Sequence, residues 1–322
     1  MAAGCGEGSV KYNHIERMNG TMKKFLTLML TLALLLAGGA FAEGAMTLTA
    51  PSGAPALAVA TLAAENPDSY HFVAADTIAS AFAAQEADFI IAPVNAGAKL
   101  FKAGKSTYKL AAVVTWGNLY IASQKADFKL EDLKNGTLTL FGENTINASI
   151  VNYALAQGGY TPAQTEYLAG AAETQALLLS DAEAMVVTAE PALTGARMKN
   201  ENITAYAVND LYKAASGFDG YTQAGLFVKA ETLEKDPEGV KAYLAQAAEA
   251  CNKCASDPAA VAEAAAAAGI LPNAKVAQKA IPGCALRYVS AAEAREQIET
   301  TAQVDLSQFG GAVPADDFYY AE

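Results

Sequence analysis

The clearest sign of the fold is the sequence Ala87-Asp-Phe-Ile-Ile-Ala-Pro-Val-Asn-Ala-Gly97. Its first half, Asp88–Ala92, is a short apolar run of the kind that forms a buried strand. Its second half, 93–97, opens a helix, because proline is well suited to the first turn of a helix. A strand that leads directly into a helix is the repeating unit of an α/β fold.

The same alternation extends in both directions along the chain. We predict strands at the following positions: Met46–Ala50, Tyr70–Ala74, Asp88–Ala92, Tyr108–Ser123 with a break at Trp116-Gly117-Asn118, Thr137–Phe141, Glu166–Leu168, Ala184–Val187, Ile203–Val208 and Tyr221–Lys229. We predict helices at Pro55–Ala64, Ile78–Gln85 with a cap at Asp76 or Thr77, Ile146–Gln157, Glu173–Leu179, a helix opened by Thr188–Pro191, and then Ala259–Ala268 and Ala291–Gln303 in a mostly helical C-terminal part.

Alternating strands and helices predict parallel sheets with helices on both faces. Each series is too short for a TIM barrel, so we expect two α/β lobes. The first lobe is expected to comprise 44–117 with 222–322, and the second 118–221. The chain would cross between them twice, near Trp116–Tyr120 and near Gly217–Gln223.

Composition limits the classes of function. The 322 residues are 52% hydrophobic and 17% charged, which excludes a disordered chain and a coiled coil. The formal net charge is −12, so the chain has little material for the basic face that nucleic acid or an anionic membrane would need. We expect neither partner.

The N-terminal region has the pattern of a secretory signal peptide. A basic start at Met22-Lys23-Lys24 precedes an apolar run, Phe25–Ala37, and then Gly38-Gly39. The run ends at Ala40-Phe41-Ala42, which has the small-residue spacing that signal peptidase recognises. We expect cleavage after Ala42 and a periplasmic or otherwise extracytoplasmic, monomeric product with no stable membrane insertion. Residues 1–21 would be sequence upstream of a start at Met22 or Met18.

Three cysteines follow the expected cleavage point. Cys251 and Cys254 lie three residues apart in a helical pattern, and Cys284 lies further on. Export permits disulfides, so we expect Cys284 to pair with Cys251 or Cys254. Free buried thiols are the alternative. A metal site would lack a fourth ligand, and a redox pair would open a helix rather than close one.

Catalytic motifs are largely missing after the signal region. The chain has no dinucleotide-binding glycine pattern, no P-loop, no nucleophile elbow and no zinc-protease motif. His71, in the strand-like Tyr-His-Phe-Val, is more typical of a structural histidine than of a ligand. We therefore predict no enzyme activity, no cofactor and no metal.

The loops that follow the predicted strands are rich in small and polar residues. Ligands of open α/β sheets bind at these strand ends, against helix N-termini. The candidate ligand-binding residues are Ser52, Gly53, Asn95, Trp116, Asn118, Asn144, Thr145, Thr188, Glu190 and Tyr221. Each polar side chain can equally serve as a helix cap. Trp116, at the expected junction, would be either a stacking wall for a ligand or a core residue between the lobes.

These loops resemble those of ABC-importer substrate-binding proteins, in particular the nitrate, sulfonate and taurine branch that includes binders of thiamine-pyrimidine precursors. The similar segments are Ala50–Pro55, Ala87–Gly97, Thr115–Tyr120, Ala182–Pro191 and the tail with Gly310-Gly311, Pro314 and Phe318-Tyr319-Tyr320. The resemblance implies a type 2 periplasmic-binding-protein fold, a small-molecule ligand held between closing lobes, and ABC permease subunits as partners.

One departure concerns the charge of the ligand. Members that bind sulfonate or nitrate often use basic side chains near the cleft, whereas the candidate loops have only Lys99 nearby. Glu190, Trp116 and Tyr221 would suit a polar, planar or weakly cationic ligand instead. Two alternatives stay open: an exported enzyme of the same fold acting on a pyrimidine-like molecule, and a sensory protein that presents its ligand to a receptor.

Overall fold

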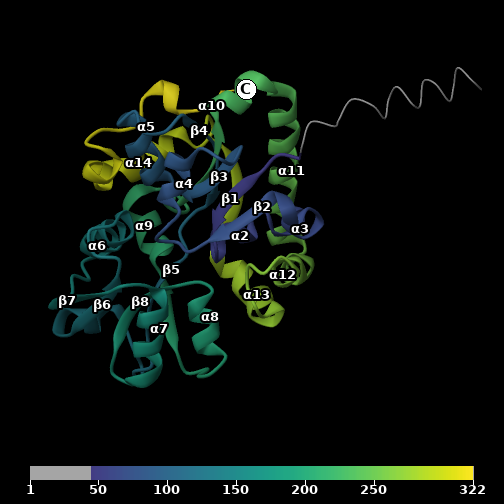
Figure 1. Cartoon of the computed structure of the whole chain (residues 1–322). Coiled ribbons are helices and arrows are strands. Elements are labelled where there is room, and N and C mark those ends of the chain that lie inside the picture. Colours follow the sequence, from purple (N-terminus) through teal and green to yellow (C-terminus); the bar gives the residue numbers. More distant parts are fainter. Residues whose placement is uncertain (1–44, 322) are drawn as a thin grey trace, which may run out of the picture. The chain divides into compact units, whose positions relative to one another are not determined.

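The structure, a computed structural model, describes residues 45–321, in which two β-sheets are flanked by helices (Figure 1). The expected signal peptide, 1–42, lies outside the described residues. We call the part built on the first sheet lobe 1 and the part built on the second sheet lobe 2. No helix among residues 45–321 combines the length and the apolar character needed to cross a membrane.

The first sheet has six strands in the order β11-β4-β10-β3-β1-β2. They are β1 (Leu48–Pro51), β2 (Tyr70–Val73), β3 (Phe89–Pro93), β4 (Tyr108–Thr115), β10 (Ala224–Lys229) and β11 (Leu286–Ser290). β1 pairs in parallel with both β2 and β3, whereas β10 runs antiparallel to β3 and β4, and β11 antiparallel to β4.

The second sheet has five strands in the order β7-β6-β8-β5-β9. They are β5 (Leu119–Ser123), β6 (Thr137–Phe141), β7 (Gln164–Leu168), β8 (Met185–Ala189) and β9 (Thr204–Ala207). β6 is parallel to β7 and β8, and β5 is antiparallel to β8 and β9.

Both sheets are therefore mixed, not parallel as predicted. The reversed strands β5 and β10 each directly follow a crossing of the chain from one sheet to the other. Each occupies the same place in its sheet, next to the third strand of the parallel set. Hydrophobic pattern predicts that such a segment is a strand but not which way it runs, because direction depends on where the preceding chain enters the sheet.

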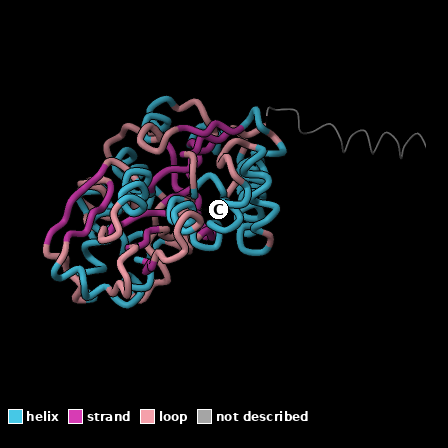
Figure 2. The backbone as a smooth tube through the Cα atoms, turned by 90° about the horizontal axis from the view of Figure 1, so that it is seen from below, coloured by secondary structure: helices cyan, strands magenta, loops and turns pink. Residues whose placement is uncertain are grey.

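The helices pack beside the strands of both sheets (Figures 1 and 2). They are α2 (Ala54–Leu57), α3 (Ala60–Glu65), α4 (Ala79–Ala84), α5 (Val94–Lys102), α6 (Ile146–Gly158), α7 (Ala171–Ser180), α8 (Ala192–Arg197), α9 (Val208–Ser216), α10 (Ala230–Lys235), α11 (Pro237–Ser256), α12 (Pro258–Ala267), α13 (Ala274–Ala280) and α14 (Arg295–Val304). The short 3-10 turns η3 (Ile281–Cys284) and η4 (Leu306–Phe309) flank β11 and α14.

Most predicted elements are present, with three kinds of difference. The helix predicted from Pro55 is split into α2 and α3, and α4 has no side-chain cap from Asp76 or Thr77. Helices α9 and α10 and strand β11 were not predicted. Strand β11 mixes intermediate and exposed positions, so its pattern lacks the apolar run that identifies the central strands.

Alternate residues of β3 face two different cores. Phe89 and Ile91 pack with the residues of α2, α3, α11, α12 and α13, whereas Ile90 and Ala92 pack on the side of α4 and α5. This is the two-residue period of a strand buried on both faces. The core that contains Ile90 continues without interruption into lobe 2, where it includes residues of α6 and α9.

The three described cysteines belong to the core on the α11 side. The structure has Cys251, Cys254 and Cys284 as free, buried thiols rather than the expected disulfide. Two of them make weak hydrogen bonds: the Cys254 thiol donates to the Leu57 carbonyl at 3.5 Å, and the Cys284 thiol to the Ala280 carbonyl at 3.2 Å. Their burial makes them core residues in this structure.

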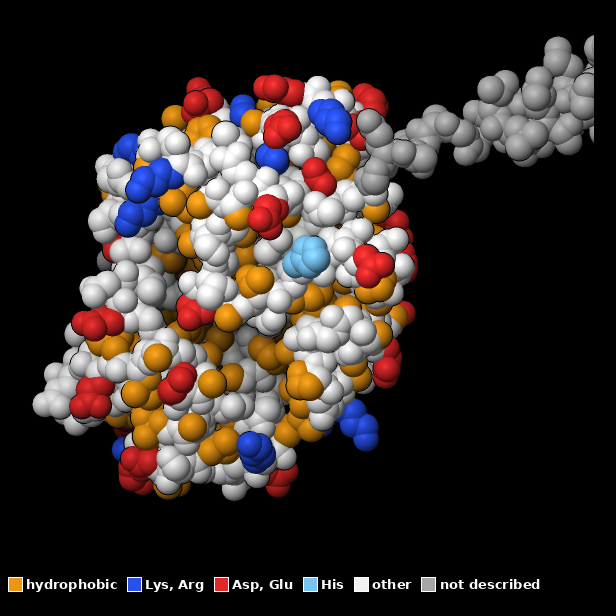
Figure 3. All heavy atoms as spheres, viewed as in Figure 1, with side chains coloured by type: hydrophobic (Ala, Val, Ile, Leu, Met, Phe, Trp, Pro, Cys, Tyr) orange, Lys and Arg blue, Asp and Glu red, His pale blue; other side chains and the backbone are white. Residues whose placement is uncertain are grey.

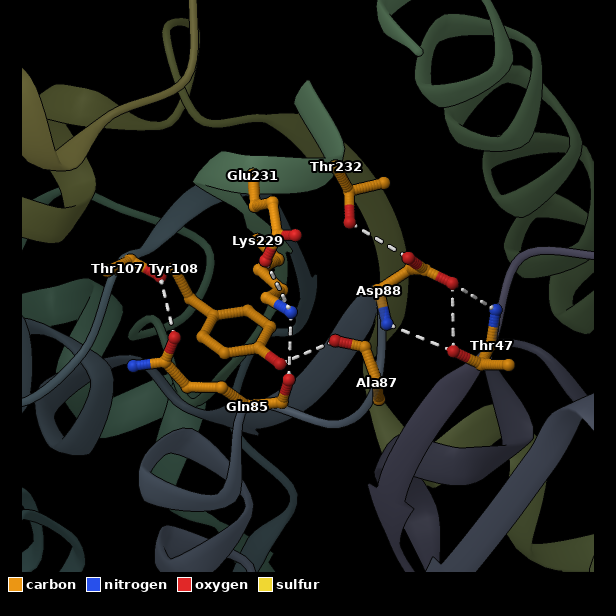
Figure 4. A network of polar contacts seen from close by, with 9 residues as sticks. All are labelled: Thr47, Gln85, Ala87, Asp88, Thr107, Tyr108, Lys229, Glu231 and Thr232. Carbon is orange, nitrogen blue, oxygen red and sulfur yellow. Dashed lines mark hydrogen bonds and ion pairs between the residues drawn. The ribbon is translucent and has the colours of Figure 1, made fainter. Parts of the chain in front are cut away.

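A carboxylate joins the start of the first sheet to α10 (Figure 4). One oxygen of Asp88 accepts from the Thr47 backbone N–H at 2.9 Å and from the Thr47 hydroxyl at 2.8 Å. Its other oxygen accepts from the Thr232 hydroxyl at 2.8 Å. The chain entering β1, the chain entering β3 and helix α10 are thereby held at one point.

Candidate ligand-binding cavity

A cavity of about 290 Å³ lies at the strand ends where the two lobes meet. Its lining comes from lobe 1, lobe 2 and the crossings between them: Pro51, Ser52, Pro55, Ala75, Ile78, Pro93, Asn95, Ala96, Asn118, Thr145, Ile146, Asn147, Gln223, Ala224 and Gln308. On the face shown in Figure 3 the surface is hollowed between the upper and lower parts, and orange and white atoms predominate around the hollow.

Lobe 1 contributes the ends of β1 and β3. Ser52 follows β1, and its backbone N–H donates to the Val73 carbonyl at 2.9 Å, which fixes the loop against β2. The next residue, Gly53, has a φ of 108°, which favours glycine and permits the turn into α2. Asn95 lies in the first turn of α5, directly after β3. The predicted placement of these two loops at the strand ends is thus what the structure has.

Lobe 2 contributes the N-terminus of α6. Thr145 is the N-cap: its hydroxyl accepts from the Ala148 N–H at 3.4 Å and donates to the Gly142 carbonyl at 2.6 Å. Ile146 and Asn147, the first two residues of the helix, line the cavity beside it. Asn144 does not line the cavity with its side chain, but its carbonyl accepts from the Gln308 amide at 3.1 Å.

Both crossings line the cavity. Asn118 lies in the first crossing, directly before β5, and Gln223 lies in the second, directly before β10. The Gln223 amide donates to the Asn118 side-chain oxygen at 3.0 Å. Asn118 in turn donates to the Glu190 carbonyl at 3.0 Å. These bonds fix the orientation of two amides that face the cavity from neighbouring segments.

Two asparagines at the cavity have unused hydrogen-bonding capacity. The side-chain oxygens of Asn95 and Asn147 are buried and have no hydrogen-bond partner among the described residues. One lies on α5 of lobe 1 and the other on α6 of lobe 2. Because a buried polar atom without a partner costs roughly 1–3 kcal/mol, these amides are the natural place for a polar ligand to bind.

The residues that line the cavity include no charged side chain. The backbone provides positive electrostatic potential instead, since the N-termini of α5 and α6 both lie at the cavity wall. A helix N-terminus presents free N–H groups and a partial positive charge. The site is therefore equipped to bind hydrogen-bonding groups of a ligand without an ion pair.

Trp116 is a core residue and does not line the cavity. Its indole N–H donates to the Arg287 carbonyl at 2.8 Å, and the Arg287 guanidinium lies 4.4 Å from the ring centre. The Asn209 amide also binds the Trp116 and Gly117 carbonyls, each at 2.9 Å. The sequence left two interpretations of Trp116 open, a stacking wall for a ligand or a core residue. The structure has it as a core residue between the lobes.

Three other predicted site residues are also buried away from the cavity. Tyr221 is fully buried, and its hydroxyl has no hydrogen-bond partner among the described residues. Thr188 is buried, and its hydroxyl lies 3.5 Å from the Ala171 carbonyl. Glu190 accepts from the Thr194 N–H at 3.1 Å and from its hydroxyl at 2.9 Å. Burial raises the pKa of Glu190 above its ordinary value, although the bonds from Thr194 oppose the shift.

The sequence-based argument for a planar or weakly cationic ligand depended on Glu190, Trp116 and Tyr221. Since none of the three lines the cavity, the structure gives that argument no support. His71 is exposed on β2, and Lys99 is exposed on α5; neither lines the cavity. The predicted residues that do line it are Ser52, Asn95, Asn118 and Thr145.

Sequence reasoning missed Asn147, Gln223 and Gln308. Asn147 and Gln223 lie within three residues of predicted site positions, so extending each loop by one turn would have included them. Gln308 gave no such signal, because it follows α14, far along the chain from any strand that enters the cavity. Only the folded chain brings it there.

Comparisons with known proteins identify the fold. No protein-family model and no curated protein matches the chain. Among solved structures, it is similar to an ABC transporter protein from Parabacteroides distasonis, at 22% identity and a TM-score of 0.73, over 87% of this chain and 100% of that one. It is similar to the periplasmic aliphatic sulphonate binding protein SsuA from Escherichia coli, at 16% identity and a TM-score of 0.66, over 86% and 92%. It is also similar to the alkanesulfonate-binding protein SsuA from Xanthomonas axonopodis pv. citri bound to MOPS, at 15% identity and a TM-score of 0.59, over 86% and 96%. The chain shares with these proteins a two-lobed α/β fold, the fold of periplasmic binding proteins.

Proposed function

We propose that this protein is an extracytoplasmic solute-binding protein that captures a small polar molecule between its two lobes and delivers it to an ABC importer. The observation that carries the proposal is the cavity at the lobe junction, which takes side chains from both lobes and from both crossings. A ligand bound there contacts both lobes and so favours the arrangement in which they close around it.

The lining supports binding rather than catalysis. Its polar members are serine, threonine, asparagine and glutamine, and no cysteine, histidine, lysine or carboxylate is among the described residues that line the cavity. A serine or threonine nucleophile needs an adjacent general base, and acid–base catalysis needs a titratable side chain at the reacting atoms. We infer that the protein is not an enzyme.

We propose a small, uncharged polar molecule as the ligand. The volume of about 290 Å³ lies just below the usual range for small-molecule sites, about 300–1,000 Å³, which favours a small ligand. Amides on both lobes supply hydrogen bonds, and proline, alanine and isoleucine side chains supply apolar walls. Two of the similar structures are named as sulfonate-binding proteins, so sulfonates are the ligands to compare directly.

Export and partners follow from the sequence and from the proposed role. The signal-peptide pattern at 22–42 supports delivery to the periplasm, and a binding protein of this fold would meet ABC permease subunits there as a monomer. We propose lobe boundaries of 44–117 with 222–322 and of 118–221. All six strands of the first sheet and all five of the second lie within those ranges.

A thermal-shift screen of the full-length protein tests the function. Uracil, acetamide, ethanolamine, MOPS and sulfate represent pyrimidines, neutral amides, amines, sulfonates and oxyanions. A ligand present at 100 times its Kd adds about 2.7 kcal/mol of stability, which is readily seen as a rise in Tm. We expect the neutral compounds to give the rise. A rise with MOPS alone would contradict the proposed ligand class, and no rise with any class would contradict the function.

Variants then locate the site. Asn95→Ala and Asn147→Ala should each weaken binding by about 1–3 kcal/mol, or roughly 5- to 150-fold in Kd, because each removes one amide partner. Asn252→Ala is the matched control, since Asn252 is exposed on α11. If both cavity variants bind as tightly as the control, the site lies elsewhere.

A further inference from the structure

The short segment 305–309, which follows α14, joins lobe 1 to lobe 2 beside the cavity. On the lobe 1 side it packs against α5, where Phe309 is buried in the core. The Lys102 ammonium of α5 also donates to the Gly310 carbonyl at 2.8 Å. The segment is therefore fixed to the helix that carries Asn95 at its other end. We call residues 305–309 the strap.

Two hydrogen bonds connect the strap to lobe 2. The Ser149 hydroxyl of α6 donates to an Asp305 carboxylate oxygen at 2.7 Å. The Gln308 amide donates to the Asn144 carbonyl at 3.1 Å. Asn144 and Ser149 lie on either side of the first turn of α6, so the strap holds that turn from both ends.

The state of Asp305 suits this contact. Hydrogen bonds from Ser307 and Ser149 hold its pKa below the ordinary value, against the effect of partial burial. It is thus a carboxylate at neutral pH, able to accept from both hydroxyls. The same carboxylate caps η4 through the Ser307 N–H at 3.1 Å, which links the shape of the strap to its contact with α6.

Gln308 is the point where the strap meets the cavity. It lines the cavity together with Thr145, Ile146 and Asn147 of α6. Its side-chain nitrogen donates to the Asn144 carbonyl of lobe 2. Its side-chain oxygen has no hydrogen bond to any described residue. A ligand that donates a hydrogen bond to this oxygen would contact a side chain whose position depends on lobe 2.

We propose that Gln308 is a further ligand-contacting residue, and that the strap latches lobe 2 over the cavity through Asn144 and Ser149. Only the ligand contact of Gln308 rests on the proposed function. The hydrogen bonds of the latch are present without ligand. It predicts a hydrogen-bond donor, N–H or O–H, on the part of the ligand that reaches Gln308.

Hydrogen exchange of the ligand-free, full-length protein tests the latch. In Ser149→Ala/Gln308→Ala, the amides of the first turns of α6 should exchange at least about tenfold faster, while those of its last two turns stay unchanged. The matched control is Ser180→Ala/Gln303→Ala, which removes the same groups at exposed positions of α7 and α14. Ser149→Thr, which keeps the hydroxyl, should behave like the wild type.

Binding of the compound that most raises the Tm of the wild type tests the ligand contact. Gln308→Ala should weaken its binding at least fivefold and mainly raise the dissociation rate, because it removes a hydrogen-bond acceptor that holds the bound ligand. Unchanged exchange in the double variant overturns the latch, and unchanged affinity in Gln308→Ala overturns the contact. A screen without any hit contradicts the proposed function but leaves the exchange result to decide the latch.

Discussion

The indole of Trp116 stabilises the junction through its burial and two contacts with Arg287, and none of these involves the cavity. It is buried, its N–H binds the Arg287 carbonyl, and its ring faces the Arg287 guanidinium. Trp116→Phe should therefore lower the free energy of unfolding by about 1–3 kcal/mol, since it removes a buried donor and leaves the carbonyl without it.

Ligand affinity should change less than about threefold in Trp116→Phe, because the ring does not line the cavity. Urea unfolding and a binding titration of the same preparation separate the two effects. A large loss of affinity with unchanged stability would show that the indole contacts ligand after all.

The buried thiols make a second prediction at the residue scale. Burial raises the pKa of Cys254 to about 12, and it also raises the pKa of Cys251 and of Cys284. Since the thiolate is the reactive form, iodoacetamide should label these three residues at least about tenfold more slowly in the native protein than in urea. Mass mapping under non-reducing conditions should find three unlinked peptides. A peptide linked through Cys284 would instead support the disulfide expected from the sequence.

At the scale of elements, the Asp88 carboxylate fixes how β1, β3 and α10 meet. The carboxylate accepts three short hydrogen bonds. One of the donors, the Thr47 backbone N–H, cannot act as an acceptor. Asp88→Asn replaces one acceptor oxygen by an amide donor. We expect a loss of roughly 1–3 kcal/mol in the free energy of unfolding.

The control for Asp88→Asn is Asp68→Asn, the same change at an exposed residue of the turn before β2. Thermal unfolding of both variants checks the prediction. Equal Tm values for the two would mean that the hydrogen bonds of the Asp88 carboxylate in Figure 4 add nothing measurable to stability.

At the scale of the whole molecule, Glu190 lies where lobe 2 meets lobe 1. Tyr120 of β5 donates to the Gly283 carbonyl at 2.8 Å, and a Cβ added at Gly283 would lie 3.0 Å from the Glu190 side chain. The raised pKa means that the folded state favours the protonated carboxyl. As pH rises, the unfolded chain loses this proton first, so the wild type loses stability.

Glu190→Gln should remove this pH-dependent loss. Its stability relative to the wild type should be constant below the ordinary carboxyl pKa and should rise with pH until the raised pKa of the folded protein is passed. Urea unfolding at several pH values between 4 and 8 measures the difference, in which titrations common to both proteins cancel. A difference that stays flat, or that falls with pH, would contradict the assigned direction of the shift.

Local pattern determined most of the elements and pointed to four of the polar residues that line the cavity. The apolar run at 89–92 identifies a strand because a strand buried on both faces has few polar positions. At 137–141 the β-branched threonines alternate with leucines, which is also typical of a strand. Thr145 was predictable as the cap of α6 because a threonine before an apolar helical pattern supplies the acceptor that free N–H groups need. Ser52 and Asn95 followed from their places at strand ends.

The tertiary structure alone decided the direction of β5 and β10, the burial of Trp116 in the core and the position of Gln308 at the cavity. Strands β5 and β10 are reversed because the chain enters each sheet from the other one, which no local pattern encodes. The sequence around a tryptophan at a junction is the same whether the indole faces a ligand or the core. Here the indole N–H donates to the carbonyl of Arg287, 171 residues further on, and this contact holds it in the core. Gln308 reaches the cavity because α14 packs beside α6, a contact between segments far apart in the chain. Sequence therefore fixes what short-range physics controls, and long-range packing selects which of the polar side chains face the cavity.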